Sequence, residues 1–211
     1  MPTYLFTQTY VVLVMKSLPF ALILVAGLAN AQALNFKVVG DKLTYRNVAT
    51  VESNTEFETF TGRTSNVSGN LVFNPKAKTG SGKIVVDLKS IDTGIAARND
   101  HMNSEGWLNT AKYPTATFQT TSVKFVKDDS YRATGKFTLH GVTKTITVPV
   151  TVKYRAESAA TKQAGFAGHV LQTVARFDIK LSDYGIKIPS MAAGKVANTV
   201  QLVVSSYATT K

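Results

Sequence analysis

The strongest constraint on the fold is a two-residue alternation of apolar and polar side chains that recurs along most of the chain. It is clearest in two neighbouring segments, residues 131–140 and 143–154, which are separated by Gly141 and Val142. Successive side chains of a β-strand point to opposite faces, so this period gives each segment one apolar and one polar face. The two segments are therefore expected to pair as an antiparallel hairpin with one face against a core and the other in solvent.

Similar strand-like segments, each bounded by turn-forming residues, occur from residue 34 to residue 207. One of them, residues 50–60, is expected to be a single strand. A spacing of about 8–12 residues between such segments is typical of an all-β sandwich or barrel. No long helical pattern separates them, which argues against a parallel α/β fold. The last segment ends near the C-terminus, where it is placed to pair with the first and close a barrel.

Residues 1–31 have the pattern of a signal peptide. Met15-Lys16 gives a charged start, residues 18–28 are almost uninterruptedly apolar, and Ala29-Asn30-Ala31 is an A-x-A cleavage site. Met15 is a better start for such a signal than Met1. We therefore expect a mature domain of residues 32–211 in the periplasm or outside the cell, with an uncleaved N-terminal anchor as the alternative.

Composition narrows the chemistry and the partners. The chain has no cysteine, which excludes disulfides, thiol catalysis and Fe–S clusters. It has 24 basic and 13 acidic residues and a formal charge of +11. In an exported protein this charge suggests peripheral contact with an anionic membrane rather than with nucleic acid. The basic residues are scattered, so a generally solubilising surface is the simpler interpretation, and a homodimer is left open.

Residues 90–118 interrupt the strand pattern with a polar, non-alternating segment that contains the only tryptophan of the chain. We expect a short helical or irregular connection over about 92–113, which acts either as a latch on the barrel or as a site. The candidates for contact with a ligand head group, or for the latch, are Arg98, Asp100, His101 and Tyr113. The planar guanidinium of Arg98 suits a phosphate, and pairing with Asp100 is the alternative.

Enzymatic chemistry has little support in the sequence. The three histidines, His101, His140 and His169, have no paired spacing of the kind that zinc ligands show. Asp92 lies in a turn, where a carboxylate ordinarily bonds its own backbone. We therefore expect no metal, no catalytic residue and no enzyme. A metal-dependent envelope enzyme that uses residues 90–118 is the alternative.

An eight-stranded barrel either fills with side chains or holds one small ligand, and periodicity does not distinguish the two. The residues expected to line the interior share an apolar side chain on the inward face of a strand, or an anchoring role in the connection. They are Phe57, Phe73, Ile84, Val86, Leu88, Trp107, Phe118, Phe137, Leu139, Ile146, Val148, Phe177 and Ile179.

Several blocks of sequence resemble the YceI-like family in order and spacing. They are Gly82–Gly94, Arg98–Met102, Trp107-Leu108, Lys112–Phe118 and Thr134–Lys144, followed by Val148-Pro149-Val150. The resemblance implies a single antiparallel eight-stranded barrel, similar to lipocalins, with a long apolar channel. It also implies a bound isoprenoid lipid, such as an isoprenoid quinone or a polyprenyl phosphate, and a periplasmic or secreted location.

The sequence thus predicts an exported protein that sequesters or carries an isoprenoid lipid, or a similar amphiphile, in an apolar barrel, with no cofactor besides that lipid. A basic protein that binds the cell-envelope surface through a filled barrel is the other alternative.

Overall fold

The computed structural model describes residues 32–211, so the predicted signal peptide and the choice between Met1 and Met15 lie outside the described residues. The strands are β1 (Leu34–Val38), β2 (Val48–Asn54), β3 (Thr59–Thr64), β4 (Val67–Asn74), β5 (Thr79–Asp87), β6 (Thr115–Lys127), β7 (Ser130–Leu139), β8 (Val142–Arg155), β9 (Val170–Lys180) and β10 (Thr199–Thr209). The helices are α1 (Ala96–Asn103) and α2 (Ala159–Gln163), with 3-10 turns η1 (Asp41–Arg46), η2 (Leu181–Tyr184) and η3 (Ser190–Ala192).

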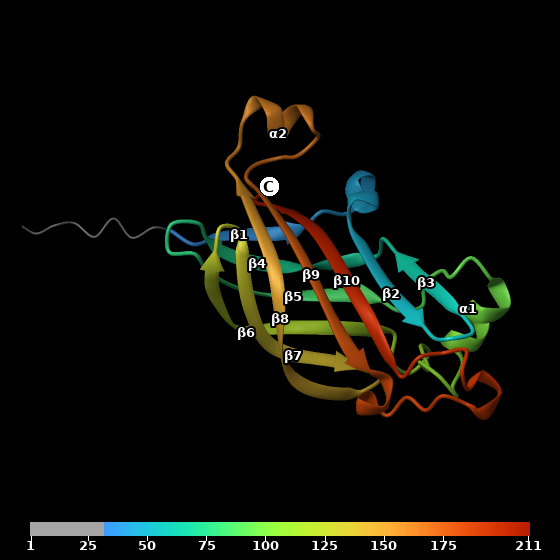
Figure 1. Cartoon of the computed structure of the whole chain (residues 1–211). Coiled ribbons are helices and arrows are strands. Elements are labelled where there is room, and N and C mark those ends of the chain that lie inside the picture. Colours follow the sequence, from blue (N-terminus) through green and yellow to red (C-terminus); the bar gives the residue numbers. More distant parts are fainter. Residues whose placement is uncertain (1–31) are drawn as a thin grey trace, which may run out of the picture. The chain divides into compact units, whose positions relative to one another are not determined.

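All ten strands form one antiparallel sheet, which closes on itself through the pairing of β1 with β10 (Figure 1). β1 and β2 lie one after the other along the same edge of β10. β3 and β4 follow one another in the same way, because β3 pairs with β2 and β4 pairs with β1. Each of these pairs acts as one interrupted strand, so the predicted eight-stranded, lipocalin-like antiparallel barrel is confirmed.

The interruption between β1 and β2 is bridged by one buried side chain. Asn47 is fully buried, and its Nδ2 donates to the Val39 carbonyl oxygen at 2.7 Å. Its Oδ1 accepts the backbone N–H of Tyr207, on β10, at 3.0 Å. The Asn47 amide therefore replaces the strand-to-strand hydrogen bonds that are lost where η1 leaves the sheet.

Residues 50–60 are a hairpin rather than the single strand that their alternation predicted. β2 ends at Asn54 and β3 begins at Thr59. Between them the Thr55 N–H donates to the Glu58 carbonyl, and the Thr55 Oγ1 accepts the Glu58 N–H at 3.0 Å. A threonine that bonds nearby backbone in this way favours a turn over a continued strand.

The connections gather at the two ends of the barrel. The end that we call the α1 end is formed by residues 55–58, 88–114, 140–141 and 181–198. The opposite end, here the α2 end, is formed by residues 75–78, 128–129 and 156–169. The predicted connection over about 92–113 contains α1, as expected. In the part of the chain that the structure describes, no helix is long and apolar enough to cross a membrane.

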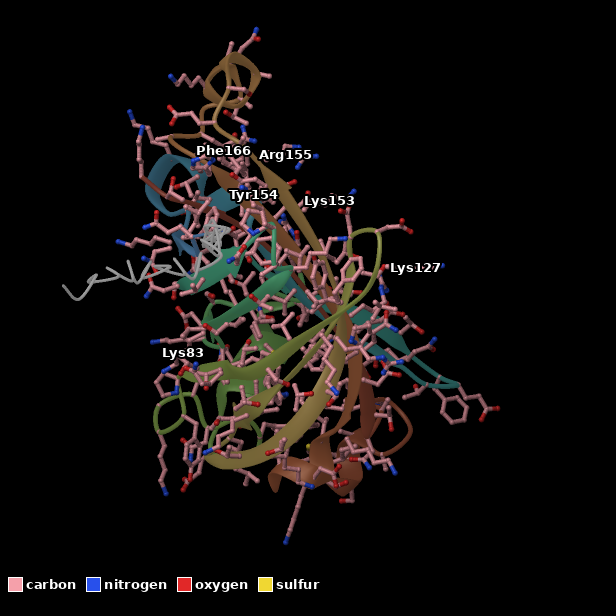
Figure 2. All side chains as sticks on the ribbon, turned by 90° about the vertical axis from the view of Figure 1, so that its left-hand side faces the viewer. Lys83, Lys127, Lys153, Tyr154, Arg155 and Phe166 are labelled. Atoms are coloured by element: carbon pink, nitrogen blue, oxygen red, sulfur yellow. The ribbon has the colours of Figure 1, made fainter. Side chains whose placement is uncertain are left out.

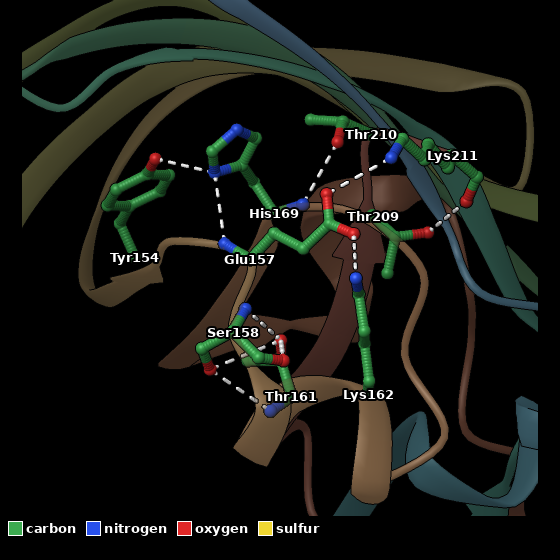
Figure 3. A network of polar contacts seen from close by, with 9 residues as sticks. All are labelled: Tyr154, Glu157, Ser158, Thr161, Lys162, His169, Thr209, Thr210 and Lys211. Carbon is green, nitrogen blue, oxygen red and sulfur yellow. Dashed lines mark hydrogen bonds and ion pairs between the residues drawn. The ribbon is translucent and has the colours of Figure 1, made fainter.

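A polar network fastens the connection at the α2 end (Figure 3). The Tyr154 hydroxyl and the Glu157 N–H both lie within hydrogen-bond distance of Nδ1 of His169, at 2.8 and 3.3 Å. The Glu157 carboxylate lies 3.1 Å from the ammonium groups of both Lys211 and Lys162, and hydrogen bonds from these two lysines lower its pKa. His169 and α2 are thereby tied to the end of β10, so this histidine has a structural role.

Candidate binding cavity

The barrel is hollow. A chamber of about 830 Å³ lies at the α1 end, and a second chamber of about 130 Å³ lies toward the α2 end. Five side chains border both chambers: Val86, Ala116, Phe137, Phe177 and Val204. The two spaces are therefore consecutive parts of one apolar interior.

Two aromatic rings stand where the chambers meet. Phe137 and Phe177 touch edge to face, with ring centroids 5.8 Å apart, and Phe137 also packs on Tyr184 at 5.4 Å. Beside them, Gly135 leaves room for a third ring, because a Cβ there would lie 2.7 Å from Phe118. A glycine at this position thus lets Phe118 point into the barrel.

Most residues that the sequence predicted for the lining border one of the chambers. The larger chamber is bordered by Val86, Leu88, Trp107, Phe137, Leu139, Phe177 and Ile179, and the smaller by Phe73, Ile84, Val86, Phe118, Phe137, Val148 and Phe177. Ile146 packs against the core cluster of the α1 end and is not among the lining residues.

The prediction that Phe57 lines the interior is wrong. Its side chain is 77 % exposed, because it lies in the turn between β2 and β3 rather than on a strand. Apolar and polar residues happen to alternate through the turn as they do in the strands on either side of it. The alternation therefore predicted, wrongly, that Phe57 faces the interior.

Polar groups of the cavity gather at the α1 end. The Arg98 Nη2 lies 2.7 Å from the Glu58 Oε1, and the guanidinium stacks 4.3 Å from the centroid of the Phe60 ring. Arg98, Glu58, His101 and Lys195 all border the larger chamber. The entrance therefore offers both charges of an ion pair, a histidine and a lysine to the polar end of a ligand.

Two of the predicted head-group or latch residues lie outside the lining. Asp100 is exposed on α1, and Arg98 pairs with Glu58 instead of with Asp100. The Tyr113 ring packs edge to face on His140, 4.7 Å between centroids, and covers Gly141. Tyr113 thus fixes the connection after α1 to the turn between β7 and β8, which suits a latch.

The start of the α1 connection is hydrogen-bonded to β3. Asp92 exchanges two backbone hydrogen bonds with Arg63, at 2.8 and 2.9 Å. Its carboxylate accepts Asn99 Nδ2 at 2.7 Å and the Gly94 N–H at 2.9 Å, and these bonds, chiefly that of Asn99, lower its pKa. The expectation that Asp92 bonds its own turn is confirmed.

The connection between β9 and β10 also forms part of the cavity wall, which the sequence pattern did not indicate. Ile186, Met191 and Val196 from this stretch border the larger chamber. It is held by the buried Ser53, whose Oγ accepts the Ala197 N–H at 2.9 Å. The stretch has apolar residues without a strand or helix period, so no pattern marked it as part of the cavity wall.

Within residues 32–211 the histidines lie apart. His101 borders the entrance, the His140 Nδ1 lies 3.2 Å from the Tyr184 carbonyl oxygen, and His169 belongs to the α2 end. No group of three or more His, Cys, Asp or Glu side chains with the arrangement of a metal site occurs among the described residues.

Comparison with known proteins places the chain in a family. The model of the YceI-like domain matches residues 37–208. A UPF0312 protein of Pseudomonas aeruginosa (strain LESB58) is 34 % identical over 146 residues, which cover 68 % of this chain and 71 % of that protein. Protein YceI of Escherichia coli O157:H7 is 39 % identical over 124 residues, which cover 58 % of this chain and 59 % of that protein.

Solved structures share the fold. BcnA of Burkholderia cenocepacia has a TM-score of 0.67 and 26 % identity, covering 79 % of this chain and 98 % of that chain. A polyisoprenoid binding domain from Saccharophagus degradans has a TM-score of 0.59 and 20 % identity, covering 83 % and 98 %. The family model covers most of the chain and all or part of every strand of the barrel, and the chain therefore belongs to the YceI-like family.

Proposed function

We propose that this protein binds an isoprenoid lipid, with the hydrocarbon tail in the two chambers and the head group at the α1 end. The observation that carries the proposal is the distribution of polarity in the cavity. The interior is walled mainly by aliphatic and aromatic side chains, with a few threonines and serines, whereas the charged Arg98–Glu58 pair, His101 and Lys195 border it at the α1 end. The description of the Saccharophagus degradans relative as a polyisoprenoid binding domain supports the same ligand class.

The tail supplies most of the binding free energy in this proposal. Burial of apolar surface contributes about 25 cal/mol per Å², so a chain that buries about 400 Å² gains on the order of 10 kcal/mol before the entropic costs of binding. Apolar walls give no hydrogen bonds to a methyl-branched chain. We therefore expect loose selectivity for chain length and a binding role without catalysis.

The head group determines how the Arg98–Glu58 pair behaves. A polyprenyl phosphate would compete with Glu58 for the guanidinium, which binds phosphate oxygens in a bidentate manner. We expect Arg98→Gln to weaken the binding of a polyprenyl phosphate about tenfold or more, because a charge-assisted contact is lost. Binding of an isoprenoid quinone, which is uncharged, should change little in the same variant.

A bulky substitution inside the barrel tests whether the lipid tail binds in the two chambers. Ala116 is buried and borders both chambers, so Ala116→Phe should block the passage between them. Titration of the delipidated protein with an isoprenoid quinone, followed by native mass spectrometry, should give a stoichiometric complex for the wild type and a much weaker one for Ala116→Phe. Ala111→Phe, at an exposed position outside the lining, is the matched control.

Circular dichroism and a thermal melt establish that each variant is folded. Equal quinone binding by Ala116→Phe and the wild type would argue against the interior as the binding site.

We also propose that the protein acts outside the cytoplasm, on the basis of the signal-peptide pattern in residues 1–31. Expression of the full chain in a Gram-negative host, followed by fractionation and N-terminal sequencing, tests this. A chain in the periplasmic fraction that begins at residue 32, or at residue 34 after the second A-x-A sequence Ala31-Gln32-Ala33, is the expected result, and an uncleaved cytoplasmic chain is the contrary one.

A further inference from the structure

Large apolar side chains project into solvent around the α1 end. Met191 is 81 % exposed, Phe57 is 77 % exposed and Ile95 is 49 % exposed. Single exposed apolar residues are ordinary on protein surfaces, whereas several on adjoining segments mark an interaction site.

These three side chains belong to adjoining segments. The turn that carries Phe57 is tied to α1 by the Arg98–Glu58 ion pair of 2.7 Å, and Ile95 is the residue that precedes α1. On its other side the turn meets the connection that contains Met191, since a methyl group on Gly194 would lie 3.2 Å from the Phe57 ring.

The same segments form the entrance of the cavity. Glu58, Arg98 and Met191, one from each segment, border the larger chamber. The exposed apolar side chains of the turn, of α1 and of η3 therefore stand around its opening.

The charges of the α1 end nearly cancel. Its connections hold basic and acidic residues in similar numbers, namely Lys89, Arg98, Lys112, Lys187 and Lys195 with Glu56, Glu58, Asp92, Asp100, Glu105 and Asp183. The basic excess lies toward the α2 end, where the connections and the adjoining ends of β6 and β8 hold Lys76, Lys78, Lys124, Lys127, Lys153, Arg155 and Lys162 with Asp128, Asp129 and Glu157. Figure 2 shows Lys127, Lys153 and Arg155 on that side.

We propose that the protein docks on a lipid bilayer through the rim of its larger chamber, with Phe57, Ile95 and Met191 inserted among the lipids. Burial of three apolar side chains drives the contact, and the balanced local charge makes it independent of anionic lipids. A tail could then pass between the bilayer and the chamber without crossing water. The reason for docking rests on the proposed function, whereas the docking surface is argued from exposure and position alone.

The test is co-sedimentation of the full barrel domain, residues 32–211, with vesicles of pure phosphatidylcholine at low and high salt. We expect binding at both salt concentrations, and a loss of about tenfold or more in the partition coefficient for Phe57→Ser/Ile95→Ser, which removes two rim side chains that border neither chamber. The matched control is Phe125→Ser/Val126→Ser, which removes two exposed apolar side chains near the α2 end and should leave binding unchanged.

Two results would overturn the proposal. One is binding that requires phosphatidylglycerol, disappears at high salt and is lost in Lys124→Glu/Lys127→Glu, because the basic α2 end would then be the docking surface. The other is self-association of the barrel in sedimentation velocity that Phe57→Ser/Ile95→Ser disperses, because the rim would then bind a second copy of this chain.

Failure of the docking proposal is distinguishable from failure of the proposed function. Native mass spectrometry of the same Phe57→Ser/Ile95→Ser variant should show unchanged quinone binding, since neither residue borders the larger or the smaller chamber. Vesicle binding without quinone binding would support docking and refute the proposed ligand. Quinone binding without vesicle binding would refute docking alone.

Discussion

Two buried polar side chains secure the places where strands of this barrel are interrupted or end. Asn47 bridges the gap between β1 and β2 with bonds to Val39 and Tyr207, and Ser53 binds the backbone of Ala197 across from β2. Each replaces backbone partners that the sheet does not supply at that point. A buried donor or acceptor without a partner costs about 1–3 kcal/mol, so such side chains contribute more than their size suggests.

Asn47→Ala is expected to lower the free energy of unfolding by about 3 kcal/mol, because it leaves the Val39 carbonyl and the Tyr207 N–H without their buried partner. Urea unfolding monitored by tryptophan fluorescence measures the change. Asn70→Ala, at an exposed position on β4, is the control and should stay within about 0.5 kcal/mol of the wild type. A similar small effect for Asn47→Ala would refute its bridging role.

Phe57 and Phe137 show that the same sequence pattern can occur in a turn and in a strand. Phe137 and Phe57 both lie in stretches that alternate apolar and other side chains, and only Phe137 faces the interior. The difference is set by Thr55, whose hydroxyl bonds the backbone of Glu58 and turns the chain. An alternation of period two indicates which side chains would share a face if the segment is a strand. Whether the strand continues depends on local contacts, such as a hydrogen bond from a side chain to nearby backbone.

Two connections at the α1 end complete the wall of the larger chamber. The stretch with α1 is held to β3 through Asp92, and the stretch with η2 and η3 is held to β2 through Ser53. The first was predictable as a special segment, because its polar composition and its tryptophan break the alternation. The second was not, because its wall residues Ile186 and Val196 have no period and take their place only through contacts with distant strands.

Asn99 is expected to control the acidity of Asp92. Its amide donates to the Asp92 carboxylate and is the main cause of the lowered pKa of that group. In Asn99→Ala the pKa of Asp92 should rise toward its usual value of 3.8, which an NMR titration of the carboxyl carbon follows. Asp100→Asn, an exposed substitution on α1, tests for a general charge effect and should leave the Asp92 titration unchanged.

The sign of the pH effect follows from the lowered pKa. The stabilisation from ionised Asp92 is fully present above the unfolded pKa and is lost as the pH falls through the folded value. The α1 connection should therefore loosen below about pH 4, and this acid sensitivity should shrink in Asn99→Ala. An unchanged Asp92 titration in Asn99→Ala would contradict the proposed bond.

Ser53→Ala is expected to loosen the second connection. The change leaves the Ala197 N–H without its partner and should lower the free energy of unfolding by about 1–2 kcal/mol. Hydrogen exchange should accelerate most over residues 186–198, where the connection loses its attachment to β2. Protection that stays unchanged there would show that other contacts hold the wall.

For the whole molecule, the all-β class and antiparallel pairing follow from the alternation, because it repeats over most of the described chain. The volume of the interior does not follow from it. The size of the chambers depends on which residues face the interior, such as the small Ala116 that borders both, and on two aperiodic connections that border the larger chamber at the α1 end. Both depend on register between strands that are distant in sequence, which a pattern in one segment does not contain.

The central claim is that the chambers hold an isoprenoid lipid. The most direct measurement is native mass spectrometry of protein purified from its own host, followed by organic extraction and identification of whatever lipid is released. We expect one isoprenoid molecule per barrel, which organic solvent removes and an added isoprenoid quinone or polyprenol restores. An empty barrel that takes up neither lipid would contradict it.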